Sequence, residues 1–296
     1  MTIANAVPLP VPATFRILRA VFLLATAAIA PFPAHTADPP PKPADVADPG
    51  ASITVHVISG SKEYESESSL KPFLVDLEMH YRVKVTASWG SDGGETLENL
   101  DALKNADLLL LFARRMKLPE DQMKLIRAHW EAGRPIVGIR TASHAFQEAD
   151  NDTFDRQVLG GSHQSHWADE PVKVTNRPDQ ADHPVLRGVA PFVSRKLYKR
   201  ADLLKDVIIL QTGDNGKDIQ PVTFTRVHNG GRIFYTSLGV PEDFKKDNFR
   251  RLLINAIFWT THRDLERMIA ATRMQRLNSL FVGLAVNRRA QASPAR

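Results

Sequence analysis

One stretch near the middle of the chain decides the fold: Pro135-Ile136-Val137-Gly138-Ile139-Arg140-Thr141-Ala142-Ser143-His144. Its first half is a short apolar run after a Gly-Arg-Pro turn, which is typical of a buried parallel strand. Its second half changes to small and hydroxylated residues of the kind that open a helix. A strand that turns sharply into a helix has the geometry of a nucleophile elbow, which holds one residue at the carboxyl edge of a sheet. The helix N-terminus beside that residue favours anionic groups.

The residue at the tip of this elbow is Arg140, and the chain contains no cysteine. An arginine stays protonated and offers only hydrogen-bond donors, so Arg140 cannot act as a nucleophile and is a very poor general base. It can instead bind a carboxylate, a phosphate or an oxygen that gains negative charge during a reaction. A structural ion pair at the sheet edge is the alternative. We favour the binding role.

Strands and helices alternate regularly on the N-terminal side of the elbow. Apolar runs predict strands at residues 53–58, 83–87 and 106–112, and the elbow strand is the fourth. Between them we expect helices at residues 66–80, 97–103 and 118–133. This alternation predicts a parallel sheet with right-handed crossovers.

The pattern loosens after the elbow. Strands are expected at residues 172–175, 207–210, 221–225 and 232–236, with Asn229-Gly230-Gly231 joining the last two as a hairpin. An apolar-striped helix at residues 248–260 should close the domain. The predicted fold class is therefore α/β, a three-layer sandwich around a mostly parallel central sheet.

Composition limits the classes of function. A chain of 296 residues with 43% hydrophobic content suits one large α/β domain. Its net charge is +5, but residues 261–296 alone carry seven Lys/Arg and two Asp/Glu, so the rest of the chain is neutral. A nucleic-acid surface on the domain is therefore not expected. The lack of cysteine excludes disulfides, thiolate metal sites and a lipoprotein anchor.

The two ends of the chain differ from the domain. Residues 1–37 are expected to be a signal peptide, because Arg16 and Arg19 precede an apolar run at 20–30 that is too short to span a bilayer; an uncleaved N-terminal anchor is the alternative. A Pro-rich linker follows at 38–50, then the domain at 51–260 and a basic C-terminal tail at 261–296. We expect a periplasmic or secreted protein, with peripheral membrane contact by either end as a minority alternative.

Ligands of open α/β sheets bind beyond the carboxyl ends of the strands. That rule selects Ser61 after the first strand, Arg114 and Arg115 after the third, and Thr141 and Ser143 within the elbow. Converging arginines indicate an oxygen-rich or anionic ligand. Ordinary loop charges are the alternative for Arg114 and Arg115.

Histidines are densest at His163 and His166, in a glycine-flanked segment that we expect to be a loop. With His144 in the elbow, they could act as general acids or bases, could hydrogen-bond a substrate, or could pack structurally. A divalent metal is a further alternative, with Asp182, His183 or His144 as a third ligand. Trp167 could stack on a sugar face or belong to the core.

Several segments together resemble the ThuA-like (trehalose-utilisation) family. They are residues 107–115, the elbow at 138–146, Gly160-Gly161 with His163 and His166, Asp182-His183-Pro184, and Tyr235-Thr236-Ser237-Leu238-Gly239. The resemblance covers roughly residues 53–260 and implies a fold similar to class I glutamine amidotransferases (flavodoxin-like). It also implies pocket roles for Arg114 or Arg115, for His183, which could instead anchor its turn, and for Ser237. Amidotransferase chemistry is not carried over, because the elbow lacks the cysteine of those enzymes.

The resemblance implies an exported protein of carbohydrate utilisation. It would bind and transform a saccharide or keto-sugar at the elbow, as a hydrolase or lyase, with Arg140, His144, His163 and His166 as catalytic candidates. The alternatives are a non-catalytic sugar- or anion-binding module and a metal-dependent hydrolase that uses His163 and His166. No dinucleotide-binding glycine fingerprint is present, so no such cofactor is expected. A homo-oligomer is left open.

Overall fold

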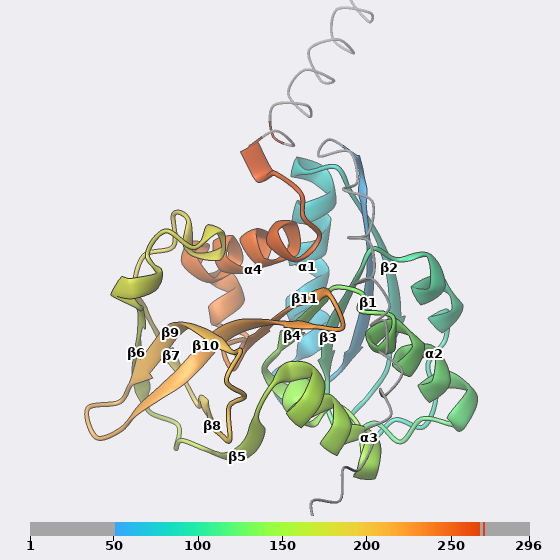
Figure 1. The fold of residues 1–296 in the computed structure, drawn as a ribbon, viewed down its shortest axis with the longest axis horizontal. Coiled ribbons are helices and arrows are strands. Elements are labelled where there is room, and N and C mark those ends of the chain that lie inside the picture. Colours follow the sequence, from blue (N-terminus) through green and yellow to red (C-terminus); the bar gives the residue numbers. More distant parts are fainter. Residues whose placement is uncertain (1–50, 267–268, 270–296) are drawn as a thin grey trace, which may run out of the picture. The chain divides into compact units, whose positions relative to one another are not determined.

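The computed structural model describes residues 51–266 and 269. Its centre is a nine-stranded sheet in the order β2-β1-β3-β4-β11-β10-β9-β6-β7 (Figure 1). The predicted signal peptide or anchor, the Pro-rich linker and nearly all of the basic tail lie outside the described residues.

The first five strands in this order run parallel. They are β2 (Val83–Trp89), β1 (Ile53–Gly60), β3 (Leu108–Ala113), β4 (Ile136–Ile139) and β11 (Gly231–Thr236). Every residue of β3 and β4 is buried, as expected for parallel strands covered by helices on both faces. Because these strands are parallel, their carboxyl ends meet at one edge of the sheet.

The remaining strands are antiparallel. Strand β10 (Ile219–His228) pairs with β11 through the expected hairpin, in which Asn229 and Gly230 take φ values of 48° and 85°. The sheet continues through β9 (Ile208–Asp214), β6 (Pro171–Asn176) and β7 (Phe192–Arg195). A separate two-stranded hairpin joins β5 (Ser162–His166) to β8 (Tyr198–Ala201). Sequence analysis did not predict β5, β7 or β8.

Helices cover both faces of the sheet. On one side, α1 (Ser66–His80) and α4 (Asp247–Thr260) contribute to the same buried cluster, which includes Phe73 and Phe249. On the other side, α2 (Glu120–Glu131) packs Met123, Ile126 and Trp130 into a second cluster. Figure 1 shows α1 and α4 on the side of the sheet opposite α2 and α3 (Glu148–Asp152). The predicted three-layer sandwich with a mostly parallel sheet is confirmed.

The elbow differs from the expected strand-to-helix turn. Its tip, Arg140, has a φ of 49°, in the left-handed region that few non-glycine residues adopt. The following residues Arg140–His144 form a single 3₁₀ turn instead of a long helix. The chain then continues through the short α3 into a π-helical segment, Thr153–Leu159. The expected helix N-terminus, and with it an anion site made by helical amides, is therefore not formed at the elbow.

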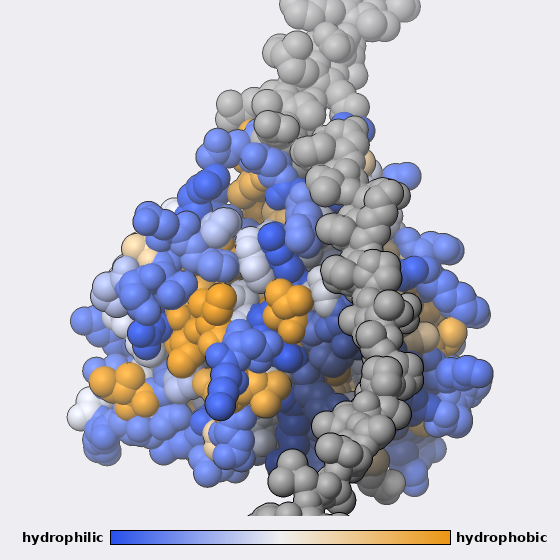
Figure 2. Space-filling view, in the orientation of Figure 1, coloured by the Kyte–Doolittle hydropathy of each residue, from blue (hydrophilic) through white to orange (hydrophobic). Residues whose placement is uncertain are grey.

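Hydrophobic side chains on the surface occur in small groups. The most exposed large ones include Val75 and Met79 on α1, Val193 on β7, and Ile219 and Val227 on β10. Figure 2 shows separate hydrophobic groups surrounded by hydrophilic residues on the visible face. In the described part of the chain, no helix combines the length and the apolar character needed to cross a membrane.

Candidate functional site

The loops after the first four strands are bonded to one another at the carboxyl edge of the sheet. The amide of Arg114, after β3, donates to the carbonyl of Gly60 at the end of β1 over 3.0 Å. The amide of Arg115 donates to the carbonyl of His144 in the elbow over 2.8 Å. The loop after β2 joins through Asp92, whose Oδ1 accepts from the amide of Lys62 over 2.9 Å. Sequence-distant loops thus form one continuous surface.

Arg140 lies inside this edge and not on it. Its side chain is 0% exposed, and its guanidinium donates to two backbone carbonyls, those of Ser237 (3.0 Å) and Lys196 (2.6 Å). Its Cζ atom lies 3.8 Å from the ring centroid of Tyr64 and 4.8 Å from that of Tyr198. The planar guanidinium is well suited to this combination of carbonyls and aromatic faces.

This burial bears on both roles considered for Arg140. The structural ion pair, which was the alternative to the favoured binding role, is not formed among the described residues, since the partners of Arg140 are carbonyls and rings. A direct contact between Arg140 and a ligand would require Tyr64 or Tyr198 to move. In this conformation Arg140 holds the end of β11 and the segment before β8 against the elbow.

His144 and His163 are partly exposed and lie side by side at this edge. Their ring centroids lie 4.6 Å apart, and Tyr198 lies 5.2 Å from the first and 4.8 Å from the second. Nδ1 of His144 lies 3.1 Å from Oγ of Ser143. Nδ1 of His163 is buried and has no hydrogen-bond partner in the described structure. The sequence-predicted elbow histidine and one of the two later histidines are therefore brought together.

Both imidazoles are held neutral. Burial lowers the pKa of His144 to about 3, and the proximity of His163 and the positive charges of Arg114, Arg115 and Arg200 act in the same direction. Burial also lowers the pKa of His163 to about 4. A neutral imidazole offers one donor and one acceptor, so the pair can exchange hydrogen bonds with hydroxyl groups at neutral pH.

A buried ion pair fixes the position of His163. Asp155 on the π-helical segment accepts a 2.6 Å hydrogen bond from the His163 amide through Oδ2. Its Oδ1 lies 2.6 Å from Nη1 of Arg200, and the side chains of both partners are almost completely buried. Burial raises the pKa of Asp155, although Arg200 opposes this shift. In the paired strands β5 and β8, His163 and Arg200 are direct partners, so the ion pair locks that register.

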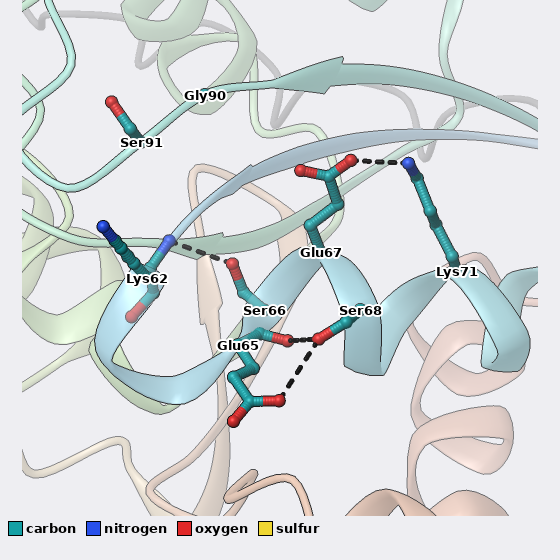
Figure 3. A pocket seen from close by; sticks show the side chains of 9 residues that line it. Lys62, Glu65, Ser66, Glu67, Ser68, Lys71, Gly90 and Ser91 are labelled. Atoms are coloured by element: carbon teal, nitrogen blue, oxygen red, sulfur yellow. Dashed lines mark hydrogen bonds and ion pairs between the residues drawn. The ribbon is translucent and has the colours of Figure 1, made fainter.

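A cavity of about 470 Å³ lies at the same edge, between the loop after β2 and the start of α1. Ser66, Ser68 and Ser91 give it hydroxyl groups (Figure 3). Ser61 also lines it. Ser61 is 1% exposed, and its Oγ has no hydrogen-bond partner. The four charged side chains of the lining have balanced signs: Lys62, Glu65, Glu67 and Lys71. A hydroxyl-rich, charge-balanced lining suits a neutral polar ligand better than an anion.

The other predicted residues of the edge differ in what they can contact. Arg114 is half-buried between Glu63 (3.3 Å) and Asp92 (3.5 Å). Arg115 is exposed and has a φ of 51°. The hydroxyls of Thr141 and Ser237 are buried without partners. Arg115 is therefore the more accessible cation, while Arg114 is already paired with two carboxylates.

Three predicted residues are not part of this group. Trp167 is 4% exposed in the core, where its Nε1 donates to Asp218, so its ring offers no face to a sugar. His183 lies near Trp259 at the end of α4, with ring centroids 5.1 Å apart, and its Nδ1 accepts from the amide of Val185. That position is at the opposite edge of the sheet. His166 is exposed at the end of β5, and both histidines of the segment lie in a strand, not in the expected loop.

The most important residues that sequence analysis missed are Tyr64, Asp155, Tyr198 and Arg200. Tyr198 and Arg200 share one face of β8, but Leu197-Tyr198-Lys199-Arg200 has no apolar–polar alternation that could have predicted that strand. No sequence pattern marks Tyr64 or Asp155, since each gains its role from a partner far along the chain.

The described residues contain no group of three or more His, Cys, Asp or Glu side chains arranged to hold a metal ion. The pair His144 and His163 has no third ligand of that kind in the described part of the chain. The ligand set required for a protein-bound zinc is thus incomplete there.

Comparison with known proteins agrees with the fold described above. The family model described as "ThuA: Trehalose utilisation" matches residues 54–260. A comparison with curated protein sequences gave no match. Among solved structures, a ThuA-like protein from Bacteroides uniformis is 18% identical, with a TM-score of 0.55, and the match covers 80% of this chain and 98% of that one.

Two further structures share the fold. A ThuA-like protein from Parabacteroides merdae is 16% identical with a TM-score of 0.55, and the match covers 71% of this chain and 90% of that one. Agd3, described as a novel carbohydrate deacetylase, is 15% identical with a TM-score of 0.50, and the match covers 72% of this chain and 33% of that one. The expected ThuA-like resemblance and its fold are therefore confirmed, and the family description supports a general sugar-related role. From residue 54 to residue 260, the chain belongs to the ThuA (trehalose utilisation) family.

Proposed function

We propose that this protein binds a saccharide of the trehalose or keto-sugar class at the carboxyl edge of its sheet and transforms it. The ligand would lie beside His144 and His163 and extend toward the hydroxyl-rich cavity that Ser61 lines. The family description and the carbohydrate activity in the description of Agd3 support a sugar as the class of ligand.

The observation that carries the proposal is the pair of neutral imidazoles packed against Tyr198. A sugar hydroxyl both donates and accepts hydrogen bonds, and a neutral imidazole does the same. Tyr198, which is itself only 4% exposed, packs against both histidine rings and holds them in place. Arg115 supplies an exposed cation that can stabilise an oxygen gaining negative charge.

For the chemical step, His144 or His163 would accept a proton from a substrate hydroxyl or from water. Both rings are unprotonated at neutral pH, so neither can begin as a general acid, and their low pKa values also make them weak bases. Arg140 would act through Tyr64 and Tyr198, which it holds in place, rather than by touching the sugar.

The test is calorimetric titration of the protein with trehalose, related disaccharides and keto-sugars, followed by turnover assays with any sugar that binds. His163→Ala should weaken binding about tenfold or more, because a lost hydrogen bond in a dry site costs roughly 1.4 kcal/mol. His80→Ala is the matched control, since His80 is an exposed histidine on α1. Unchanged affinity in His163→Ala and in His144→Ala would exclude this site.

The non-catalytic alternative is a binding module that presents a sugar to a partner. It predicts the same loss of affinity in His163→Ala but no turnover of any bound sugar by the wild type. The metal-dependent hydrolase predicts turnover that depends on added zinc or manganese and is lost in His166→Ala. His166 is exposed and separate from the His144–His163 ring contact, so that variant distinguishes the two histidines.

We also propose that the protein is exported, as the charged and apolar pattern of residues 1–37 predicts. Expression of the full chain in a bacterial host, followed by fractionation and N-terminal sequencing, tests this. A mature protein in the periplasm or medium that begins near residue 38 is the expected result. An intact N-terminus in the cytoplasm would contradict export.

A further inference from the structure

A second cavity lies at the amino edge of the sheet, opposite the elbow. It has a volume of about 380 Å³ and is lined in part by Arg232, Trp259, His262, Arg263 and Asp264. Arg232 belongs to the start of β11, and its neighbour Ile233 pairs with Ile136 at the start of β4. Since the elbow follows the other end of β4, the two cavities are on opposite edges of the sheet.

Two guanidinium groups in this cavity have no acidic partner among the described residues. Arg232 donates one hydrogen bond, to the carbonyl of Trp259 over 2.7 Å, and its Cζ lies 4.7 Å from the centroid of the Trp259 ring. Arg263 donates from Nη1 to the carbonyl of Thr261 over 3.1 Å, and its Nε is buried without a partner. Each guanidinium has five N–H groups, so most of their donors are unused.

The lining also contains one carboxylate, that of Asp264, whose Oδ1 accepts from the amide of Glu266 over 2.9 Å. Arg187, a third arginine of the lining, lies 3.2 Å from Glu266 and is thereby paired. Burial lowers the pKa of Arg232. The pKa of His262 is also lowered, first by burial and then by the positive charges of Arg232 and Arg263. The chain that follows cannot supply a counter-charge from a side chain, because residues 267–296 contain no Asp or Glu.

Helix capping explains only part of this arrangement. Cations near the end of a helix interact favourably with its last carbonyls, and both arginines donate to carbonyls at or just beyond the end of α4. Capping uses one N–H of each guanidinium. It accounts neither for the buried, unpartnered Nε of Arg263 nor for an open cavity between the two side chains.

We propose that Arg232, His262 and Arg263 form a second ligand site, which binds the carboxylate or phosphate group of a small molecule at the amino edge of the sheet. Arginine guanidinium groups bind such oxyanions with paired, charge-assisted hydrogen bonds. The exposed part of Trp259 offers an apolar surface for the rest of the molecule. This site is independent of the sugar site proposed above, because it shares no residue with it.

The test uses calorimetric titration of the full protein with inorganic phosphate and with benzoate, each against sodium chloride of equal ionic strength. Arg263→Gln should weaken the binding of both anions about tenfold, because it removes charge-assisted hydrogen bonds. Arg156→Gln is the matched control, since it removes the same charge from an exposed side chain on the other face of the sheet and should leave binding unchanged. Arg263→Lys keeps the charge without the guanidinium and should give an intermediate affinity.

Trp259→Leu distinguishes a carboxylate on an aromatic or apolar molecule from a free phosphate as the ligand of this site. If the natural ligand has an aromatic or apolar body, this variant should weaken benzoate binding but leave phosphate binding intact. Equal affinities for the wild type and Arg263→Gln would overturn the proposal, as would binding of neither anion by a folded wild-type protein. The melting temperature of each variant identifies any loss of binding that results from unfolding.

Discussion

The two edges of the sheet hold similar residues but use them differently. At the carboxyl edge, three buried or half-buried arginines have partners within the protein, while Arg115 is exposed: Arg140 is held by carbonyls and aromatic rings, Arg200 by Asp155, and Arg114 by Glu63 and Asp92. At the amino edge, Arg232 and Arg263 bind one carbonyl each and have no acidic partner among the described residues. The comparison teaches that a charge marks a ligand site only when the fold leaves it without a partner.

The largest expected effect comes from breaking the buried pair at the carboxyl edge. Asp155→Ala leaves the guanidinium of Arg200 buried without its counter-charge and should lower the free energy of unfolding by about 3 to 5 kcal/mol. Urea unfolding measures the change. The double variant Asp155→Ala with Arg200→Leu should recover much of the loss, because the uncompensated charge is removed. A loss below about 1 kcal/mol for Asp155→Ala would contradict the pairing.

A second large effect is expected at Arg140. Arg140→Met should lower the free energy of unfolding by about 3 kcal/mol, because the buried carbonyls of Ser237 and Lys196 lose their donor. The sequence alone predicts a different result, a loss of ligand binding with a nearly unchanged melting temperature. Arg134→Met is the matched control, since Arg134 also donates to two backbone carbonyls but is half-exposed. An unchanged melting temperature for Arg140→Met would favour the ligand-binding role.

The buried histidines should make the free energy of unfolding depend on pH, with an effect of intermediate size. The pKa is lowered to about 4 for His56, His129 and His163 and to about 3 for His144. Since these groups bind protons less readily in the folded state, the stability present above about pH 6.5 should fall as the pH drops toward 4. Urea unfolding across this range should show the decline. His129→Gln should make the curve less steep, while a variant of the exposed His80 should not.

The smallest effect is expected for a paired charge at the amino edge. Arg187 and Glu266 are 3.2 Å apart, but their side chains are 63% and 75% exposed. Arg187→Gln should therefore change the free energy of unfolding by less than about 0.5 kcal/mol. A much larger loss would show that the amino edge is a structural centre of the fold, and this would weaken the contrast between the two edges.

Much of the fold was predictable because its strongest signals are local. The run Leu108–Leu111 and the apolar stripe of α1 depend only on neighbours in the chain, and both were predicted. The hairpin β5–β8 was not predicted, because residues 167–197 separate its two strands in the sequence. In addition, β5 is polar and gives no apolar signal. Its stability depends on the Asp155–Arg200 pair, which no local pattern reveals.

The candidate site was predictable only in part for the same reason. Strand ends pointed to Ser61, Arg115 and His144, because the rule for parallel sheets requires nothing beyond strand positions. The burial of Arg140 depends on Tyr64, Tyr198 and Ser237, which come from three other parts of the chain. The motif containing His183 was noticed, but its position at the amino edge could be seen only after the path of α4 was known.

The strand order has a consequence for how the protein is made. Strand β11 is the last strand in the sequence, yet it lies near the middle of the sheet between β4 and β10. Until residue 236 has been synthesised, one edge of β4 is unpaired. Strand β10 and the antiparallel strands beyond it then lack the strand that connects them to the parallel part of the sheet. Folding of the complete sheet must therefore wait until nearly the whole domain is available, and partial chains expose unpaired strand edges that favour aggregation. Nascent chains that stop before β11 should depend on chaperones, whereas chains that include α4 should not.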